Sequence, residues 1–290
     1  MRTVAALIAN VAITTFAVSS MLSVGFSNRA GDVVRPLKHP PAVARAVVAN
    51  FVLAPALAWL VATGIGLEEP LKIGLILVGV AAGAPFLIKL SETAASRLDL
   101  TAALLVLLLP LTVLYVPLVL PLLLPEAHVP AIGIALPLVL TMLLPLAAGL
   151  LTRALWSRAA SRAQPIMAKL STLALIILML STVVANFNGI VDVGWRGALA
   201  AVVVILGAFG CGYVLGSNRH RREVLGLGTA QRNISAATIV ASQTFDEPEV
   251  LVMVVATSVI GLAVLFPIAH VLRRREPLQH GPPAADDAAS

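Results

Sequence analysis

The sequence predicts an all-α, polytopic membrane protein of about nine transmembrane helices, arranged as inverted repeats with two discontinuous crossing helices. Three observations lead to this fold class. Of the 290 residues, 59% are hydrophobic and 12% are charged, whereas an ordinary soluble domain is about 25% charged. Uncharged apolar segments of about 18 residues or more recur along the chain, which is the length that spans a bilayer. Two of these segments are interrupted near their centres by glycine, proline or polar residues.

The apolar segments are joined by short connections, so we expect one transmembrane transporter domain over residues 1–275. The first segment carries one early charge, Arg2, and runs on to Phe26, which favours a retained helix over a signal peptide. The tail, residues 276–290, is rich in Pro, Ala and Asp, and we expect it to be disordered. The predicted spans are residues 4–26, 42–63, 71–88, 100–124, 130–151, 167–190, 198–216, 224–244 and 250–272.

The basic residues predict the orientation, because Lys and Arg are retained on the cytoplasmic side of a membrane. Sixteen of the 20 Lys and Arg residues fall on alternate connections or their flanks, and Arg232 lies within a span. The N-terminus is therefore predicted outside and the C-terminus in the cytoplasm. The chain's compactness and the lack of a targeting region favour a bacterial cell inner membrane. Few aromatic residues that could stack on bases accompany the basic clusters, so nucleic acid is not an expected partner. The expected surroundings of the chain are the lipid bilayer. Arg2, Lys72 and Arg196 lie on the opposite side.

The third and eighth segments are predicted to be discontinuous helices. The third contains GVAAGAP at residues 79–85, and the eighth contains GLGTAQRN at residues 226–233. Lipid cannot satisfy the backbone groups that such interruptions expose, so they occur where they line a cavity or pack inside protein. In secondary transporters a pair of interrupted helices, one in each half, marks the substrate site.

Arg232 is the strongest candidate for a functional residue. A charge near the bilayer centre costs about 2.5–3.5 kcal/mol on insertion scales, and such residues usually face a cavity. One interpretation is a fixed cation that replaces sodium or pairs with a substrate carboxylate. The other is a structural tie to backbone carbonyls of the broken helices. The candidate substrate-binding residues are Asn50, Pro85, Lys89, Gln231, Arg232 and Asn233.

The other candidates also have structural interpretations. Asn50, Gln231 and Asn233 either hydrogen-bond substrate or hold helices together. Lys89 lies near the cytoplasmic end of its span, where a lysine can extend its ammonium group to water. The five histidines and the single cysteine show no catalytic or metal-ligand spacing, so the sequence predicts neither an enzyme nor a metal site.

Nearly the whole chain resembles the bile acid:sodium symporter family, in its nine-helix form. The stretch from Lys38 to Pro40, followed by VANFVLAPALAW at residues 48–59, resembles a loop and the helix after it. ILVG at residues 76–79, leading into Gly83, and the stretch 228–233 resemble the two broken helices, and Pro117 and Pro121 match a further pair. The resemblance implies a core domain, a panel domain, alternating access, and transport of bile acids or other organic anions, usually driven by sodium.

The sequence departs from the positions to which the resemblance assigns sodium ligands. Sodium needs oxygen ligands, which leucine does not supply. None of the 14 acidic residues falls within a predicted span, and Arg232 would repel a cation in a low dielectric. We therefore predict no sodium cofactor of the usual kind. The departures are Leu87 and Ile88 for a Ser-Asn pair, Leu105 and Leu109 for two hydroxyl residues, Gly228 for an acidic residue and Arg232 for a glutamine, whereas Asn50 keeps an amide oxygen.

The leading hypothesis is a secondary transporter of a small organic anion that works by alternating access. Two versions remain open: sodium symport through a reduced site around Asn50 and backbone carbonyls, or sodium-independent transport with Arg232 as a permanent charge. A proton is another candidate coupling ion. The alternative from another class is a non-transporting membrane receptor or scaffold on a degenerate transporter fold. The sequence contains no ring of like charges that would favour a channel.

Overall fold

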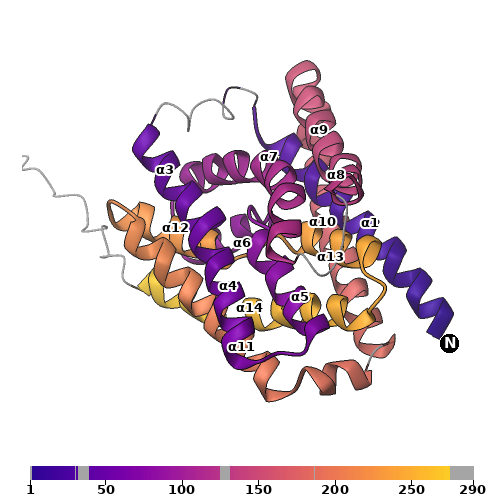
Figure 1. Cartoon of the computed structure of the whole chain (residues 1–290). Helices are drawn as coiled ribbons and strands as arrows, with labels where there is room; N and C mark the ends of the chain where they lie inside the picture. The colour runs from indigo at the N-terminus through magenta and orange to yellow at the C-terminus, as the bar shows by residue number, and fades with distance from the viewer. Residues whose placement is uncertain (1, 30, 32–38, 125–130, 186, 275–290) are drawn as a thin grey trace, which may run out of the picture.

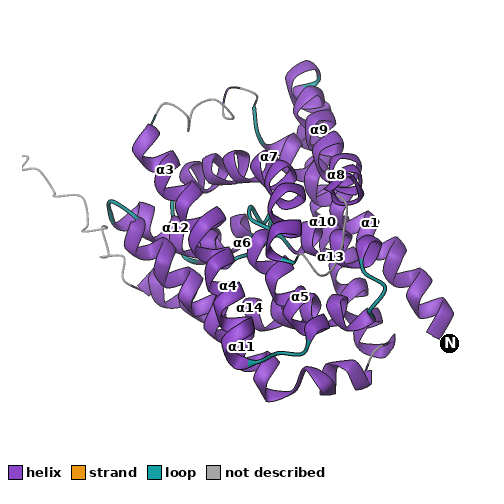
Figure 2. Cartoon of the chain, in the orientation of Figure 1, coloured by secondary structure: helices purple, strands orange, loops and turns teal. Residues whose placement is uncertain are grey.

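The computed structural model describes residues 2–29, 31, 39–124, 131–185 and 187–274, and within these ranges all regular structure is helical (Figures 1 and 2). The tail predicted at residues 276–290 lies outside the described residues. The helices are α1 (Arg2–Ser27), α3 (Pro40–Val48), the π-helical turn η2 (Ala49–Leu53), α4 (Ala54–Ile65), α5 (Glu69–Val80), α6 (Leu87–Thr93), α7 (Leu98–Leu123), α8 (Ala131–Leu138), the π-helical turn η4 (Val139–Leu143), α9 (Leu144–Leu155), α10 (Ser157–Ala185), α11 (Phe187–Leu215), α12 (Arg219–Ala230), α13 (Ile234–Thr244) and α14 (Pro248–Arg274).

The helices confirm the predicted class, an all-α polytopic membrane protein. Each predicted apolar segment coincides with one helix or with consecutive helices. Within the described ranges, 6 helices are long and apolar enough to cross a membrane, and α1 contributes a shorter apolar stretch, Val11–Ser27. The count of nine spans stays a prediction. The six are Pro40–Ile65, Leu98–Leu123, Ala131–Leu155, Ser157–Ser181, Val193–Leu215 and Pro248–Arg274.

The two predicted interruptions are confirmed as breaks between helices. Residues 81–86 separate α5 from α6, and residues 231–233 separate α12 from α13. Gly83 has a φ of 75°, a conformation that glycine adopts without the steric cost of a Cβ atom. A Cβ there would also lie 3.0 Å from the Cβ of Leu108, so α7 packs directly against the break. The third segment extends further than predicted, because α6 continues to Thr93.

Pro55 explains the π-helical turn between α3 and α4. The amide of Ala54 donates to the carbonyl of Ala49, five residues earlier, instead of the carbonyl of Asn50. Pro55 has no N–H and so cannot donate to Asn50 either. The carbonyl of Asn50 is therefore left without a donor inside its own helix. Pro145 lies two residues after the end of the second π-helical turn, η4, as Pro55 does after η2.

The helices pack in two groups, seen side by side in Figure 1. The panel group consists of α1, α8, α9 and α10. The core group consists of α3 to α7 and α11 to α14. Within the panel group, α1 and α9 cross so closely at Gly25 and Gly149 that a Cβ on Gly25 would lie 2.7 Å from the Cα of Gly149. The buried hydroxyls of Ser20 and Ser171 join α1 to α10 at 2.5 Å.

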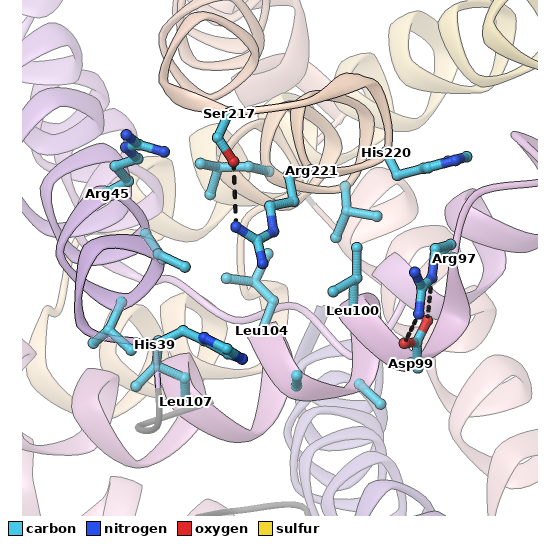
Figure 3. Close-up of a pocket in the computed structure, with 18 of the residues that line it drawn as sticks. His39, Arg45, Arg97, Asp99, Leu100, Leu104, Leu107, Ser217, His220 and Arg221 are labelled. Atoms are coloured by element: carbon cyan, nitrogen blue, oxygen red, sulfur yellow. Dashed lines mark hydrogen bonds and ion pairs between the residues drawn. The ribbon is translucent and has the colours of Figure 1, made fainter. Parts of the chain in front are cut away.

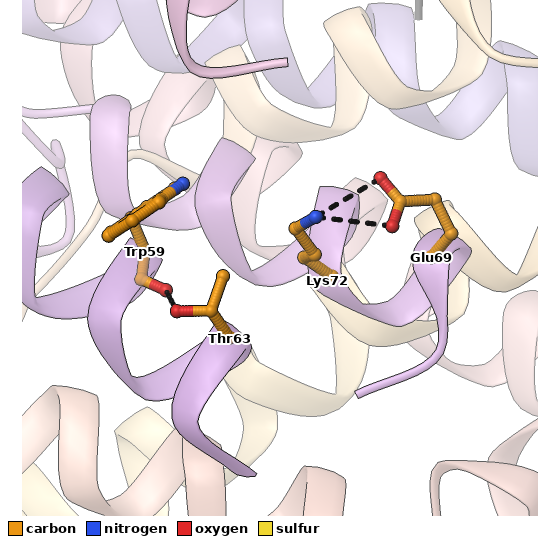
Figure 4. Close-up of polar contacts among 4 residues, drawn as sticks. All are labelled: Trp59, Thr63, Glu69 and Lys72. Carbon is orange, nitrogen blue, oxygen red and sulfur yellow. Dashed lines mark hydrogen bonds and ion pairs between the residues drawn. The ribbon is translucent and has the colours of Figure 1, made fainter. Parts of the chain in front are cut away.

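The connection between α4 and α5 is short and polar (Figure 4). The hydroxyl of Thr63 donates to the carbonyl of Trp59 at 2.7 Å in the last turns of α4. At the start of α5, the Nζ of Lys72 lies 3.2 Å from an oxygen of Glu69. Gly66 ends α4 in the left-handed conformation, so α5 turns back beside α4 and carries its C-terminus into the core group.

Candidate functional site

The two helix breaks meet and hydrogen-bond to each other inside the core group. The backbone amide of Asn233 donates to the carbonyl of Ala81 at 2.9 Å, and its side-chain amide donates to the carbonyl of Gly83 at 3.0 Å. The Oδ1 of Asn233 accepts from the amide of Ala236 at 3.1 Å and so caps α13. Asn233 therefore caps α13 and also donates to two carbonyls of the break between α5 and α6. Such hydrogen bonds are needed because lipid cannot satisfy exposed backbone groups. We call this place the crossover.

All five N–H donors of the Arg232 guanidinium have oxygen acceptors at the crossover. Nε donates to the carbonyl of Val78 at 3.2 Å. Nη1 donates to Oδ1 of Asn50 at 3.1 Å and to the carbonyl of Thr229 at 3.2 Å. Nη2 donates to the carbonyls of Asn50 at 3.2 Å and Gly79 at 2.5 Å. The residue is 5% exposed, and we call its five acceptors the oxygen cage.

The oxygen cage exists because local helix geometry leaves these carbonyls without donors. Val78 and Gly79 lie in the last turn of α5, and Thr229 lies in the last turn of α12, where carbonyls have no intrahelical partner. The carbonyl of Asn50 is released by the π-helical turn. Its side-chain amide donates to the carbonyl of Ala46 at 3.0 Å and to Oγ1 of Thr229 at 3.2 Å, which fixes Oδ1 toward Arg232. The negative ends of two helix dipoles also face the guanidinium.

α7 supports both sides of the crossover. The hydroxyl of Thr112 donates to the carbonyl of Ala82, the residue between the two carbonyls held by Asn233, at 3.0 Å. The hydroxyl of Tyr115 donates to the carbonyl of Phe51 at 2.5 Å. Pro55 would be the usual donor to that carbonyl and has no N–H. These two α7 side chains therefore satisfy backbone groups that the break and the π-helical turn expose.

Leucines pack where the resemblance assigns oxygen ligands. Leu87, Leu105 and Leu109 are buried and belong to the apolar core. A Cβ placed on Gly228 would lie 2.4 Å from Cδ2 of Leu104 and 3.1 Å from Cδ2 of Leu87. The side chains of α6 and α7 thus fill the space beside Gly228, and this part of the core is a packed apolar cluster.

The remaining predicted site residues lie in different surroundings. Lys89 is 66% exposed and pairs with Glu92, Nζ to Oε2, at 3.1 Å, away from the crossover. Pro85 is half-buried in the first break. Gln231 is buried in the second break but makes none of the hydrogen bonds that hold Arg232 and Asn233. Of the six predicted residues, Arg232 hydrogen-bonds directly to Asn50, and Asn233 hydrogen-bonds to the carbonyls of Ala81 and Gly83 in the first break. Their role toward substrate stays a prediction.

Glu223 is a buried acidic residue just before the eighth predicted span, and sequence reasoning missed it. This carboxylate lies in α12 and is 4% exposed. Oε1 accepts from Nε of Arg219 at 3.0 Å, and Oε2 accepts from the hydroxyl of Ser96 at 3.3 Å. α12 begins earlier than the predicted span and so includes Glu223, and Ser96 belongs to the connection between α6 and α7. Its i, i+4 spacing from Arg219 was the signal that could have identified it.

The class of protein that this fold defines is a polytopic membrane protein in which two discontinuous helices meet inside one group of helices, an arrangement typical of secondary transporters. The sequence model of the Sodium Bile acid symporter family matches residues 14–193, which is more than half of the chain. The chain therefore belongs to the sodium bile acid symporter family, whose members are membrane transporters rather than enzymes. No curated protein matches the chain. The family match ends before α12, so Glu223, Gly228 and Arg232 lie outside it.

Proposed function

We propose that this protein is a secondary transporter of a small organic anion, and that the Arg232 side chain takes the place of a bound sodium ion at the crossover. Alternating access would move the panel group against the core group. Family membership supports transport as the general function. The proposal that Arg232 takes the place of sodium rests on a single observation, the oxygen cage. In it, five protein oxygens accept hydrogen bonds from all five N–H donors of one buried guanidinium.

The oxygen cage offers a small cation the same ligands that it offers Arg232. Sodium binds carbonyl and amide oxygens, and here those oxygens are already occupied by N–H donors. A sodium ion about 4 Å from the guanidinium would also be repelled by about 4 kcal/mol at an effective dielectric of 20. One site cannot therefore hold both cations. Because the arginine is covalently attached, its charge is present throughout the transport cycle.

The leucines at the other positions to which the resemblance assigns sodium ligands support the same proposal. The side chains of Leu87, Leu105 and Leu109 supply no oxygen to a cation, and their burial leaves them packed against apolar neighbours. Introducing an ion there would require a charge to enter an apolar site without ligands, which costs several kcal/mol. We propose that the transporter needs no sodium at either position.

The proposed substrate site lies at the crossover, near Asn50, Pro85, Gln231 and Asn233. Because the donors of Arg232 are occupied by protein, its contribution to anion binding would be its charge rather than direct hydrogen bonds. Gln231 is the buried amide there that the hydrogen bonds around Arg232 and Asn233 do not engage, so it is the first candidate for direct contact. Lys89 would act at the entrance, where its ammonium is exposed.

Uptake of labelled organic anions into proteoliposomes tests the proposal. Wild-type protein should take up at least one anion saturably, at the same rate with an inward sodium gradient as with choline. Arg232→Gln should abolish that uptake, whereas Arg158→Gln, which changes an exposed arginine of α10, should leave it unchanged. Wild-type uptake that requires sodium would overturn the role of Arg232. Absence of flux, together with specific capture of a protein partner, would favour the alternative of a non-transporting receptor or scaffold.

A further inference from the structure

The outward face of α10 is the least covered surface among the six membrane-capable helices. In its stretch Ser157–Ser181, 17% of the most apolar window is buried inside the protein, against 33–56% in the other five. α1 packs along α10, and Figure 1 shows the N-terminal turns of α1 at the edge of the molecule. This part of the panel group therefore meets the bilayer or another molecule.

A stripe of positive charge runs along this face of α10. Arg158, Arg162 and Lys169 are exposed and follow one another at spacings of four and seven residues, which places them on one side of the helix. Within the described residues, none of the three pairs with a carboxylate. The sequence has no acidic residue at all between Glu126 and Asp192. We call these three cations the basic stripe.

Membrane topology accounts for the position of the basic stripe but not for its lack of carboxylates. Lys and Arg set the orientation of a membrane protein, whereas Asp and Glu contribute little to it, so acidic partners would be tolerated there. A basic surface beside a membrane-spanning segment attracts anionic lipid headgroups. Four cations elsewhere in the described chain are neutralised by ion pairs: Lys72 with Glu69, Lys89 with Glu92, Arg97 with Asp99 and Arg219 with Glu223.

An apolar groove of about 330 Å³ begins next to the basic stripe, between α1 and α10. Its α10 wall starts at Leu170, directly after Lys169, and continues to Ile177, which is about 10 Å along the helix. That length is about two thirds of the hydrocarbon depth of one leaflet, since the whole core is about 30 Å thick. Val11 lines the groove from α1 and is 60% exposed. The groove is therefore an apolar channel at the depth of the acyl chains.

The direction of the groove follows from the way in which α1 and α10 pack. Ser20 contacts Ser171, and further along α1, Ser23 accepts from Gln164 at 3.3 Å. The two helices are therefore antiparallel and lie side by side, so a groove between them runs along both axes. A chain that enters it beside Lys169 continues toward the bilayer centre.

A lipid matches this surface better than a second copy of the chain does. In a two-fold dimer the same patch meets itself, so the basic stripe would face an identical stripe with no carboxylate between them. Such like charges repel. An anionic lipid instead brings a phosphate to the basic stripe and an acyl chain to the groove, in the order in which the two follow each other along α10.

We propose that this face of α1 and α10 binds one anionic glycerophospholipid, with its phosphate beside Arg162 and Lys169 and one acyl chain in the groove. Arg158 lies one turn further from the groove and adds to the positive potential. The lipid is a bound component of the panel group and not the transported solute, so the inference does not rest on the proposed function.

Native mass spectrometry of the purified full-length protein tests the headgroup site, with equal amounts of dioleoyl phosphatidylglycerol and dioleoyl phosphatidylcholine in detergent. Wild type should retain one phosphatidylglycerol in preference to phosphatidylcholine. Arg162→Gln and Lys169→Gln should each lower the ratio of the two retained lipids about fivefold, whereas Lys169→Arg should keep it. Equal retention of both lipids by wild type would overturn the inference.

The matched control removes two exposed cations outside the basic stripe. Arg273 and Arg274 lie in the last turn of α14, and the double variant Arg273→Gln, Arg274→Gln should leave the lipid ratio unchanged. A loss as large as that of the stripe variants would show that net charge alone selects the lipid, and would overturn the site.

Val11→Trp tests the groove without changing a charge, so it still applies if a charge variant fails to fold. The new side chain should fill the groove from its exposed edge and lower the retention of phosphatidylglycerol at least about fivefold. Unchanged retention would overturn the acyl-chain site. A wild-type dimer in lipid-free detergent that Val11→Trp dissociates would assign this face to a second copy of the chain and would also overturn the inference.

Discussion

The guanidinium of Arg232 donates two hydrogen bonds to one residue, Asn50, which lies 182 positions earlier in the chain: Nη1 to Oδ1 at 3.1 Å and Nη2 to the backbone carbonyl at 3.2 Å. The first bond depends on the asparagine side chain. The second depends on the π-helical turn that Pro55 imposes. Together they tie the helix formed by α3 and α4 to the crossover of the two broken helices.

Replacing Asn50 should separate its side-chain role from its backbone role. Asn50→Leu removes the acceptor for Nη1 and the donor to Thr229, so we expect the free energy of unfolding to fall by about 1–3 kcal/mol. Asn50→Asp loses the donor but places a carboxylate beside the guanidinium, so its loss should be smaller. Thermal unfolding of both variants in detergent measures the difference. Equal stability of Asn50→Leu and wild type would show that the side chain does not help to hold Arg232.

Gly228 should tolerate no side chain while the leucines remain in place. Gly228→Ala would put a Cβ 2.4 Å from Cδ2 of Leu104, so overpacking should cost about 1–3 kcal/mol of stability. Adding Leu104→Ala removes the clash, and the two changes should couple by at least about 0.5 kcal/mol in a double-mutant cycle. Thermal unfolding of the four proteins gives this coupling. Additive effects would contradict the packed apolar cluster.

Replacing Glu223 and replacing its ion-pair partner Arg219 should lower the free energy of unfolding by different amounts. Glu223 is buried, whereas the side chain of Arg219 is 41% exposed and can return to water. Arg219→Leu leaves the buried carboxylate without its cation and should cost about 3 kcal/mol or more. Glu223→Leu lets Arg219 return to water and leaves the buried hydroxyl of Ser96 without an acceptor, so it should cost less, about 1–3 kcal/mol. Denaturation midpoints measured side by side test this order. A larger loss for Glu223→Leu would contradict it.

The orientation predicted from the basic residues can be measured with single cysteines. Cys211 is the chain's one cysteine, so Cys211→Ser provides a background without thiols. In intact cells, a membrane-impermeant maleimide should label Glu68→Cys, between α4 and α5, but not Ala159→Cys, at the start of α10. Both positions are exposed, and permeabilised cells should label both. The reverse pattern in intact cells would place the N-terminus in the cytoplasm.

Much of the fold could be predicted from local sequence, because membrane-spanning helices are recognisable as long apolar segments without charged residues. The interruptions predicted at residues 79–85 and 226–233 were visible as glycines, proline and polar residues in otherwise apolar segments. What could not be predicted was the geometry that depends on three chain segments meeting. The carbonyl of Asn50 becomes an acceptor for Arg232 only because Pro55 disturbs its helix and α12 ends beside it.

The cavity between α3, α7 and α12 was missed for a related reason (Figure 3). Its arginines, Arg45, Arg97 and Arg221, fitted the positive-inside pattern and were assigned to topology alone. Sequence does not reveal that His39, Arg97 and Asn218, which precede three different helices, line one cavity, or that Arg97 pairs with Asp99 there. Glu223 was missed because α12 begins before the apolar segment does.

The central claim, that the Arg232 guanidinium occupies the place of a sodium ion, is tested most directly by the unfolding temperature of the purified protein in sodium, potassium and choline chloride at equal ionic strength. A ligand that binds the folded state raises this temperature. Wild type should unfold at the same temperature in all three salts. Arg232→Gln should unfold at a lower temperature that sodium selectively raises, because the vacated oxygen cage can then accept the ion. Selective stabilisation of the wild type by sodium would contradict the claim.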